Sequence, residues 1–254
     1  MSTLAMSSSV LPLLRAAVVK GLRAARQNWP AIIGLQSAMF ALVVIYYAWP
    51  LGSGILARYA AWQASGGVLG AAFAAMIAGG LLAEVSVIYL QDRGRWTMRH
   101  VDSILFKSGL FFIGGGLVYE FYQWQAYMFG DGLNWRVILP KVLVDQLGFT
   151  VFWAAPFQTF FTRWHALDYS FPRLRAELGW RFVGERMLPV LITNWAFWLP
   201  GVTLIYAMPV RVQTPLFIFA TAIWGLLLAA LAQPHHAVEN APIPTTLLEP
   251  EAVE

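Results

Sequence analysis

Long apolar segments separated by short polar ones dominate the chain. Six segments are mostly apolar over about 20 residues, the length that a helix needs to cross the hydrocarbon of a bilayer. They cover residues 31–49, 66–90, 107–128, 143–162, 187–208 and 215–232. This pattern predicts an all-α, polytopic integral membrane protein, a helical bundle of about six transmembrane helices.

The two ends of the chain depart from this pattern. Residues 10–28 carry basic side chains among Leu, Val and Ala, loosely on one side of a helix. They predict an N-terminal amphipathic helix at an anionic membrane face, with a disordered basic arm as the alternative. Residues 234–254 are rich in Pro and acidic side chains, which is typical of a disordered tail. A single membrane domain is therefore expected over residues 1–233.

Composition and charge agree with a membrane protein. Hydrophobic residues make up 59% of the chain and charged residues 12%, whereas soluble domains have about 45–50% and about 25%. With the N-terminus in the cytoplasm, 13 of the 17 Lys and Arg residues fall on the cytoplasmic side, as the positive-inside rule requires. Both termini are therefore predicted to be cytoplasmic. The charged stretch 163–186 between the fourth and fifth spans suits an interfacial helix.

The N-terminal region allows a second interpretation. Residues 2–30 are rich in Ser and Arg and contain no acidic residue, which also describes a mitochondrial transit peptide. The apolar segment 31–49 is too long for a secretory signal and ends at "YYAWP" (46–50), which is no small-residue cleavage site. We interpret it as an uncleaved span.

Polar side chains inside the predicted spans are costly in hydrocarbon, so each needs a partner or a water-filled cavity. The candidates are Glu84, Glu120, Asp145, Gln146 and Asn194. Their depth predicts that Glu120 and Asp145 lie at similar heights in the outer half. Lys141, four residues before Asp145 on the same helix face, and Arg136 are expected beside them.

Glu84 and Asn194 are expected at similar heights in the inner half, near Arg181 or Arg186. Two such clusters, one above the other, would line a narrow hydrophilic path. The alternative is that these groups hydrogen-bond between helices and only fix their packing.

Pro200 interrupts the fifth span, in the run "LITNWAFWLPG" (191–201). A proline in a helix leaves the carbonyl four residues earlier, that of Ala196, without its backbone donor, and in lipid that carbonyl needs a side chain or water. We expect Asn194 or a Trp side chain to serve as the donor.

Common catalytic and metal-binding patterns are missing from the sequence. The chain has no cysteine and four histidines, of which two lie in the acidic tail, so it predicts no disulfide or thiolate site. No metalloprotease, serine-hydrolase, P-loop or dinucleotide motif occurs. The sequence predicts neither enzyme activity nor a cofactor or metal, and the basic loops, explained by topology, require no nucleic acid.

Five motifs appear in a characteristic order. They are "GGGLVYEFY" (114–122), "KVLVDQ" (141–146) with a later Pro156, "LITNWAFWLPG" (191–201), "YAMPVRV" (206–212) and "IWGLLLA" (223–229). In this order and spacing they resemble the Mpv-seventeen/peroxisomal-membrane-protein-twenty-two family over roughly residues 104–232.

The chain also departs from that family's pattern. The proline expected after the glycines is absent, and Tyr119 and Tyr122 replace the expected aromatic pair. Gly80, Glu84 and Gln91 are at best a loose counterpart of the Gly-Asp…Gln element of the family's first span. An additional span follows "NWP" (28–30), so the chain looks like a divergent bacterial member.

The resemblance implies a small membrane protein that acts as a weakly selective pore for a small solute or ion, without enzyme activity. It implies functional or motif positions at Asp145, Gln146, Asn194, Trp195, Trp198, Pro200 and Arg211. The expected location is the bacterial cytoplasmic (inner) membrane, with the mitochondrial inner membrane as the alternative. The expected partners are the lipid bilayer, the solute and further copies of the chain in a homo-oligomer. The alternative function is a non-transporting membrane interaction or scaffold protein.

Overall fold

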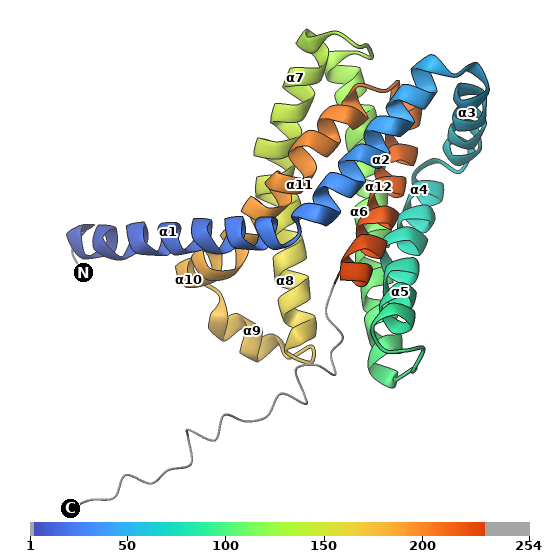
Figure 1. Ribbon diagram of the computed structural model, residues 1–254. Coiled ribbons are helices and arrows are strands. Elements are labelled where there is room, and N and C mark those ends of the chain that lie inside the picture. The colour runs from blue at the N-terminus through green and yellow to red at the C-terminus, as the bar shows by residue number, and fades with distance from the viewer. Residues whose placement is uncertain (1–2, 232–254) are drawn as a thin grey trace, which may run out of the picture.

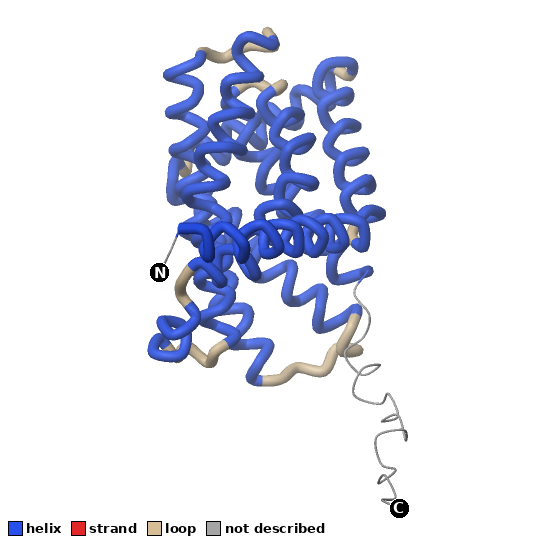
Figure 2. Tube along the Cα trace, turned by 90° about the vertical axis from the view of Figure 1, so that its left-hand side faces the viewer, coloured by secondary structure: helices blue, strands red, loops and turns tan. Residues whose placement is uncertain are grey.

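The computed structural model describes residues 3–231, so the predicted tail, 234–254, lies outside the described residues. Helices and loops alone make up the described range (Figure 2). The helices are α1 (Thr3–Gln27), α2 (Trp29–Ala48), α3 (Pro50–Ser65), α4 (Gly67–Ala75), α5 (Ala83–Leu90), α6 (Met98–Phe129), α7 (Trp135–Leu143), α8 (Ala155–Ala166), α9 (Phe171–Glu177), α10 (Trp180–Phe182), α11 (Leu188–Tyr206) and α12 (Val210–Leu231). Three π-helical segments lie between them: η1 (Met76–Leu82), η2 (Val144–Ala154) and η3 (Val183–Met187).

Four continuous helical segments are long and apolar enough to cross a membrane. They cover Gly67–Leu90, Met98–Phe129, Trp135–Ala166 and Trp180–Tyr206. Each contains or closely matches one of the second to fifth apolar segments of the sequence. The protein is therefore a multi-pass α-helical membrane protein, as the hydropathy pattern predicts.

The first and sixth apolar segments correspond to α2 and α12. Leu14–Gln27 and Ile32–Ala48 together form a pair bent by 64°, which would make a fifth span if the pair counts as one. In α12, Val210–Ile223 is a shorter apolar helix. By length and composition the described residues thus supply four spans, or up to five, rather than six.

Helix α1 lies across the other helices rather than alongside them (Figure 1). Its buried positions Ala17, Gly21 and Ala25 are four residues apart, so they form one small-residue face. That face packs on α11: a Cβ added at Gly21 would lie 2.7 Å from the Cβ of Ile192. The predicted N-terminal amphipathic helix is present, and the disordered alternative is not.

Helix α3 occupies a stretch that the hydropathy pattern leaves as a loop. Pro50 stands in its first turn, where a missing backbone N–H costs nothing. Gly52 is buried, and a Cβ there would lie 2.5 Å from the Ile45 side chain, so the chain turns back tightly between α2 and α3.

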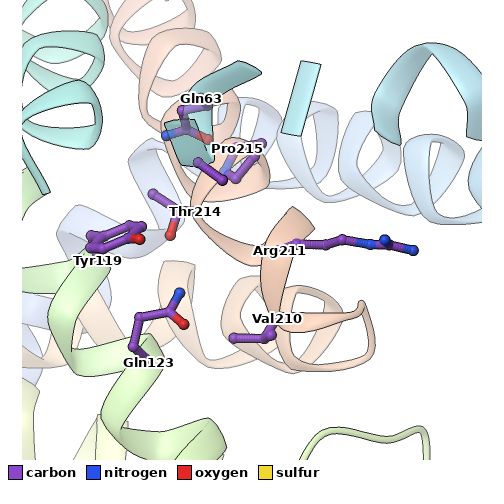
Figure 3. Close-up of a pocket in the computed structure, with 8 residues that line it drawn as sticks. Gln63, Tyr119, Gln123, Val210, Arg211, Thr214 and Pro215 are labelled. Carbon is purple, nitrogen blue, oxygen red and sulfur yellow. The ribbon is translucent and has the colours of Figure 1, made fainter. Parts of the chain in front are cut away.

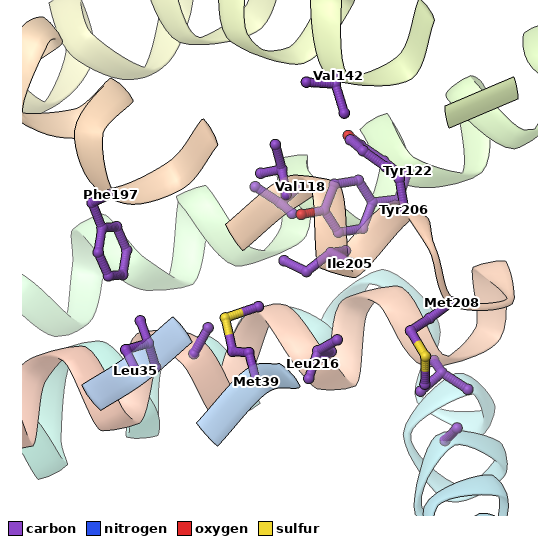
Figure 4. Packing of buried hydrophobic residues seen from close by; sticks show 14 of the residues in the cluster. Leu35, Met39, Val118, Tyr122, Val142, Phe197, Ile205, Tyr206, Met208 and Leu216 are labelled. Carbon is purple, nitrogen blue, oxygen red and sulfur yellow. The ribbon is translucent and has the colours of Figure 1, made fainter. Parts of the chain in front are cut away.

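The apolar core surrounds α12. Leu35 and Met39 of α2, Leu216 of α12, Tyr122 of α6 and Tyr206 of α11 belong to it, and Figure 4 shows the two tyrosines next to each other within the cluster. The rings of Tyr122 and Tyr206 meet edge to face with centroids 5.4 Å apart. Helices α2, α6, α11 and α12 therefore share one core, and polar groups between them are removed from both water and lipid.

The segment η1 packs closely on α6 through glycines. A Cβ at Gly80 would lie 2.6 Å from the Cα of Ser108. Just before η1, at the last residue of α4, a Cβ at Gly115 of α6 would in the same way lie 2.3 Å from the Cβ of Ala75. These small residues let the two backbones approach, as expected for the Gly- and Ala-rich second segment.

Opposite the end formed by α3 and the start of α7 lies the end that carries α9 (Figure 1). We call these the α3–α7 end and the α9 end. At the α9 end, Asp102 of α6 accepts hydrogen bonds from Tyr169 (2.7 Å) and pairs with Nε2 of His165 (2.8 Å). Desolvation and the hydrogen bond to Asp102 raise the pKa of Tyr169 to about 12.

The predicted interfacial stretch 163–186 contains α9 and α10 at this same end. Arg163 donates from Nε to Glu177 at 2.8 Å, and Arg186 lies 3.8 Å from the same carboxylate. The hydrogen bond from Arg163, together with the charges of Arg163 and Arg186, lowers the pKa of Glu177. Ionic contacts therefore hold this part of the chain against the bundle.

Candidate functional site

Asp145 lies in η2, in the half of the bundle nearer the α3–α7 end, and only 5% of it is exposed. The π-helical segment η2 begins soon after Pro140 and ends just before Pro156. Prolines lack the N–H that regular helical bonding uses, and π-helical turns occur often at functional sites. The local sequence thus places Asp145 on a widened turn that faces the core.

The Asp145 carboxyl group is the centre of a hydrogen-bonded network. The Tyr206 hydroxyl of α11 donates to Oδ2 at 2.6 Å. The Gln146 amide donates to Oδ1 at 2.8 Å, and the Thr150 hydroxyl donates to the same oxygen at 3.4 Å. The predicted pair Asp145 and Gln146 therefore lies together, inside the protein.

A third helix joins this network. The side-chain amide of Gln125, on α6, donates to the Tyr206 hydroxyl at 2.7 Å. We call Gln125, Asp145, Gln146, Thr150 and Tyr206 the Asp145 network; all five are buried. The amide oxygens of Gln125 and Gln146 are buried without a hydrogen-bond partner among the described residues.

Lys141 is almost fully buried beside the network, with 1% of its surface exposed. Its ammonium group lies 5.8 Å from the centroid of the Tyr206 ring. In the described part of the chain it forms no ion pair with Asp145. Of the residues expected beside Asp145, Lys141 therefore lies next to the network, but its contact is to an aromatic face.

Trp195 supports the network from α11. Its indole N–H donates to the backbone carbonyl of Gln146 at 2.9 Å. In an apolar interior a widened helical turn can leave a carbonyl poorly satisfied, and Trp195 supplies a second donor. This motif residue therefore orders η2 rather than facing a solute.

The side-chain donor beside Pro200 comes from a different helix than expected. The amide of Gln36, on α2, donates to the carbonyl of Phe197 at 2.9 Å. A Cβ at Gly201 would lie 3.5 Å from the Gln36 amide nitrogen, so this glycine leaves room for the approach. Gln36 thus binds the carbonyl next to the predicted one, and within the described residues neither Asn194 nor a Trp side chain donates to the Ala196 carbonyl, so the expected cap of the kink is not found.

Asn194 and Trp198 take other positions. Asn194 is half-buried, and its side chain makes no hydrogen bond within the range that the structure describes. The Trp198 ring lies 5.4 Å from that of Phe217, on α12, between ring centroids. Trp198 is thus a core contact between α11 and α12.

Glu84 does not pair with Asn194. It is buried on α5, with 4% of its surface exposed, and its carboxylate forms a short ion pair with the Lys107 ammonium of α6. Arg186 binds Glu177 instead, and Arg181 is exposed. The predicted inner pair is replaced by this acid–base pair because α5 packs on α6.

Glu120 is exposed on α6 and does not join Asp145. Tyr122, two residues later, is buried with 2% of its surface exposed. Residues two apart on a helix point about 200° from each other, so only one of them can face the core. Arg136 is also exposed and lies over the Trp135 ring.

Arg211 lies at the start of α12 on the rim of a hollow of about 130 Å³ at the α3–α7 end. Figure 3 shows its guanidinium pointing away from Tyr119, Gln123 and Thr214, which line that hollow. Arg211 therefore lies apart from the Asp145 network. Among the described residues, no group of three or more His, Cys, Asp and Glu side chains is placed to hold a metal ion.

Sequence reasoning misses four residues that organise these sites: Gln36, Lys107, Gln125 and Tyr206. A signal exists for one of them. Buried positions on α6 recur as Gly115, Val118, Tyr122 and Gln125, the spacing of one helix face. That spacing places Gln125 with the core and Glu120 away from it.

No family model, no curated protein and no solved structure matches the chain. The resemblance carried by the five motifs therefore stays a prediction.

Proposed function

We propose that the protein forms a narrow path for a small solute or ion through the membrane, with the Asp145 network as its polar constriction. The observation that supports this most is the pair of buried amide oxygens, of Gln125 and Gln146, that lack a hydrogen-bond partner in the described chain. Both side chains use their nitrogen within the network and leave the oxygen unused.

Unused acceptors argue for a hydrated interior. A buried polar group without a partner costs about 1–3 kcal/mol, and such groups in folded proteins usually bind ordered water. A network that only fixed helix packing would gain by satisfying both ends of each amide. Water bound to these two oxygens would extend the Asp145 network into a longer row of polar groups inside the bundle.

On this proposal the Tyr206 hydroxyl closes the path. The Tyr206 hydroxyl connects Gln125 of α6 with Asp145 of η2. A solute could pass only after α11 moves this ring away. Pro200 lies six residues earlier in the same helix, and a proline is where a helix bends most easily. Opening is therefore a bend of α11 that separates Tyr206 from Asp145.

The experiment is a flux assay in proteoliposomes with small ions and neutral solutes. Asp145→Asn keeps the shape of the side chain and removes its charge, so the flux or its ion selectivity should change several-fold, because charge inside a pore sets selectivity. Glu120→Gln is the matched control, since Glu120 is exposed on α6, and it should leave the flux unchanged. Equal effects of both variants would contradict the proposal.

A second candidate function is a membrane interaction or scaffold protein without transport. It is favoured by the direct pairing of both buried carboxyl groups, Asp145 with three donors and Glu84 with Lys107. This candidate expects no flux above that of empty liposomes under any ionic condition. The same assay separates the two functions.

We further propose the bacterial cytoplasmic membrane as the location, with the N-terminus in the cytoplasm. The distribution of Lys and Arg supports this orientation. Because the chain has no cysteine, a single cysteine placed at Asp131 or at Arg173 is the only thiol of the purified chain after labelling in intact cells. A membrane-impermeant maleimide should label the first position and not the second; the reverse result gives the opposite orientation.

A further inference from the structure

The hollow at the α3–α7 end lies on a different side of α6 from the Asp145 network. Gln123 lines the hollow, and Gln125, two residues later, belongs to the network. Figure 3 shows Gln63 of α3, Tyr119 and Gln123 of α6 and Thr214 of α12 around it. An inference about this hollow therefore stands apart from the proposed solute path.

Two residues that line the hollow each carry a buried polar atom that is unused. Only 5% of Gln63 and 3% of Thr214 are exposed. The Gln63 amide nitrogen and the Thr214 hydroxyl have no hydrogen-bond partner in the described range. Such groups are costly unless water or a ligand binds them, so the hollow has the polar lining of a binding site.

The unused groups belong to a convergent set. In Figure 3 the Tyr119 hydroxyl and the Gln123 amide point toward Thr214. The lining therefore offers hydroxyl groups, which donate and accept, and amide groups, which do both through separate atoms. A molecule with several hydroxyl groups could satisfy all of them at once.

The lining is neutral where a ligand would lie. Among the described residues no acidic side chain lines the hollow, and the Arg211 guanidinium points away from it. The backbone N–H of Val210, at the start of α12, already donates to the Asp131 carboxylate at 3.2 Å. The positive end of that helix is thus occupied by an acid of the chain itself, which removes the main attraction for an anion.

We propose that this hollow binds a small neutral polyhydroxy compound of about the size of glycerol. Its volume, about 130 Å³, is close to that of an engineered cavity of about 150 Å³ that holds benzene. Gln63 and Thr214 provide the hydrogen bonds that select hydroxyl groups. Pro215 and Val210 provide apolar contact for the carbon chain.

The test is saturation-transfer NMR of the full chain in lipid nanodiscs, titrated separately with glycerol, acetate and 1-propanol. The signal of glycerol should increase with its concentration and reach a plateau. Acetate, which tests an anion site, and 1-propanol, which tests a merely apolar hollow, should not saturate. Saturation by either of these in place of glycerol would overturn the proposal.

Thr214→Val and Gln63→Leu, made singly and together, remove the unused polar atoms while keeping a side chain of similar size. Loss of two hydrogen bonds should weaken glycerol binding roughly tenfold. Because these atoms have no protein partner, the variants should unfold at the same temperature or a higher one. Tyr127→Phe is the control, since Tyr127 is on α6 but 87% exposed, and should bind as the original chain does.

The same variants also give results that would contradict a glycerol site in the hollow. Glycerol affinity unchanged in the double variant would mean that glycerol binds elsewhere. A double variant that unfolds at a clearly lower temperature would mean that Gln63 and Thr214 have structural partners. Either result, or the absence of any saturable glycerol signal, overturns the proposal.

Discussion

The two halves of the bundle each bury one carboxyl group and give it different partners. Asp145, in the half near the α3–α7 end, accepts from Tyr206, Gln146 and Thr150, and two amide oxygens of its network stay unused. Glu84, in the other half, forms an ion pair with Lys107. The first arrangement leaves sites for water, whereas the second neutralises its charge directly.

This difference is the reason for proposing a structural role for one carboxyl group and a functional role for the other. An ion pair compensates the charge of each partner, and the pair Glu84 and Lys107 links α5 to α6 in this way. Neutral donors around Asp145 leave its charge uncompensated by a cation, and buried Lys141 faces the Tyr206 ring instead. An ionisable group without a cation partner in a membrane interior is a candidate functional site by default, which is the basis of the role proposed for Asp145.

The largest effect is expected from breaking the ion pair. Lys107→Met leaves the buried Glu84 carboxylate without its cation, which should lower the free energy of unfolding by about 2–3 kcal/mol, less than for a fully buried pair because the Lys107 side chain is 41% exposed. The double variant with Glu84→Gln should recover most of this loss, because the uncompensated charge is gone. Unfolding in mixed micelles by denaturant measures both. A double variant as unstable as Lys107→Met would show that the pair is not the cause.

A backbone contact beside the same pair should have the next largest effect. Gly80→Ala places a methyl group 2.6 Å from the backbone of Ser108. This overpacking should lower the free energy of unfolding by about 2 kcal/mol. Gly109→Ala is the matched control, because nothing lies within 4 Å of a Cβ there. The two variants are compared by thermal unfolding. Equal losses would contradict the close approach of η1 and α6.

The Asp145 network should tolerate the loss of a hydroxyl better than the ion pair tolerates the loss of its cation. Tyr206→Phe removes the bridge between Gln125 and Asp145. If water already enters the network, a water molecule can replace the hydroxyl. The free energy of unfolding should then decrease by only about 1 kcal/mol. A loss as large as that of Lys107→Met would mean that the network is dry.

The smallest expected effect is a change in stability at acidic pH, caused by Glu177 at the α9 end. Arg163 lowers the pKa of Glu177 in the folded protein. The stabilisation is therefore complete above the unfolded pKa of about 4.3 and is lost as the pH falls through the lower, folded value. Glu177→Gln should remove this acid-range decrease without changing flux at neutral pH. Unfolding midpoints measured between neutral and acidic pH, for both chains, test it.

Hydropathy alone locates four spans because apolarity is a local property of the chain. It misses α3, whose Gly, Ser and Arg residues lower its apolar character although Gly52 and Ala60 pack inside. The N-terminal helix α1 is predicted from its residues, but its packing on α11 through Gly21 depends on tertiary contact. Such contacts have no signature in one sequence.

The candidate site is predictable in part for a similar reason. Depth along a span gives the height of a polar residue, so Asp145 and Gln146 are found. The direction in which a residue points from the helix axis decides whether its side chain faces the core. This direction differs between exposed Glu120 and buried Tyr122. Partners on other helices, such as Tyr206 for Asp145 and Gln36 beside Pro200, follow only from the packed structure.

The most direct test of the account is a high-resolution structure of the protein in lipid that resolves ordered water. We expect a water within hydrogen-bond distance of the amide oxygens of both Gln125 and Gln146, and none between Glu84 and Lys107. Amide oxygens that instead contact only protein atoms would contradict a hydrated constriction at Asp145 and favour a packing role for the whole network.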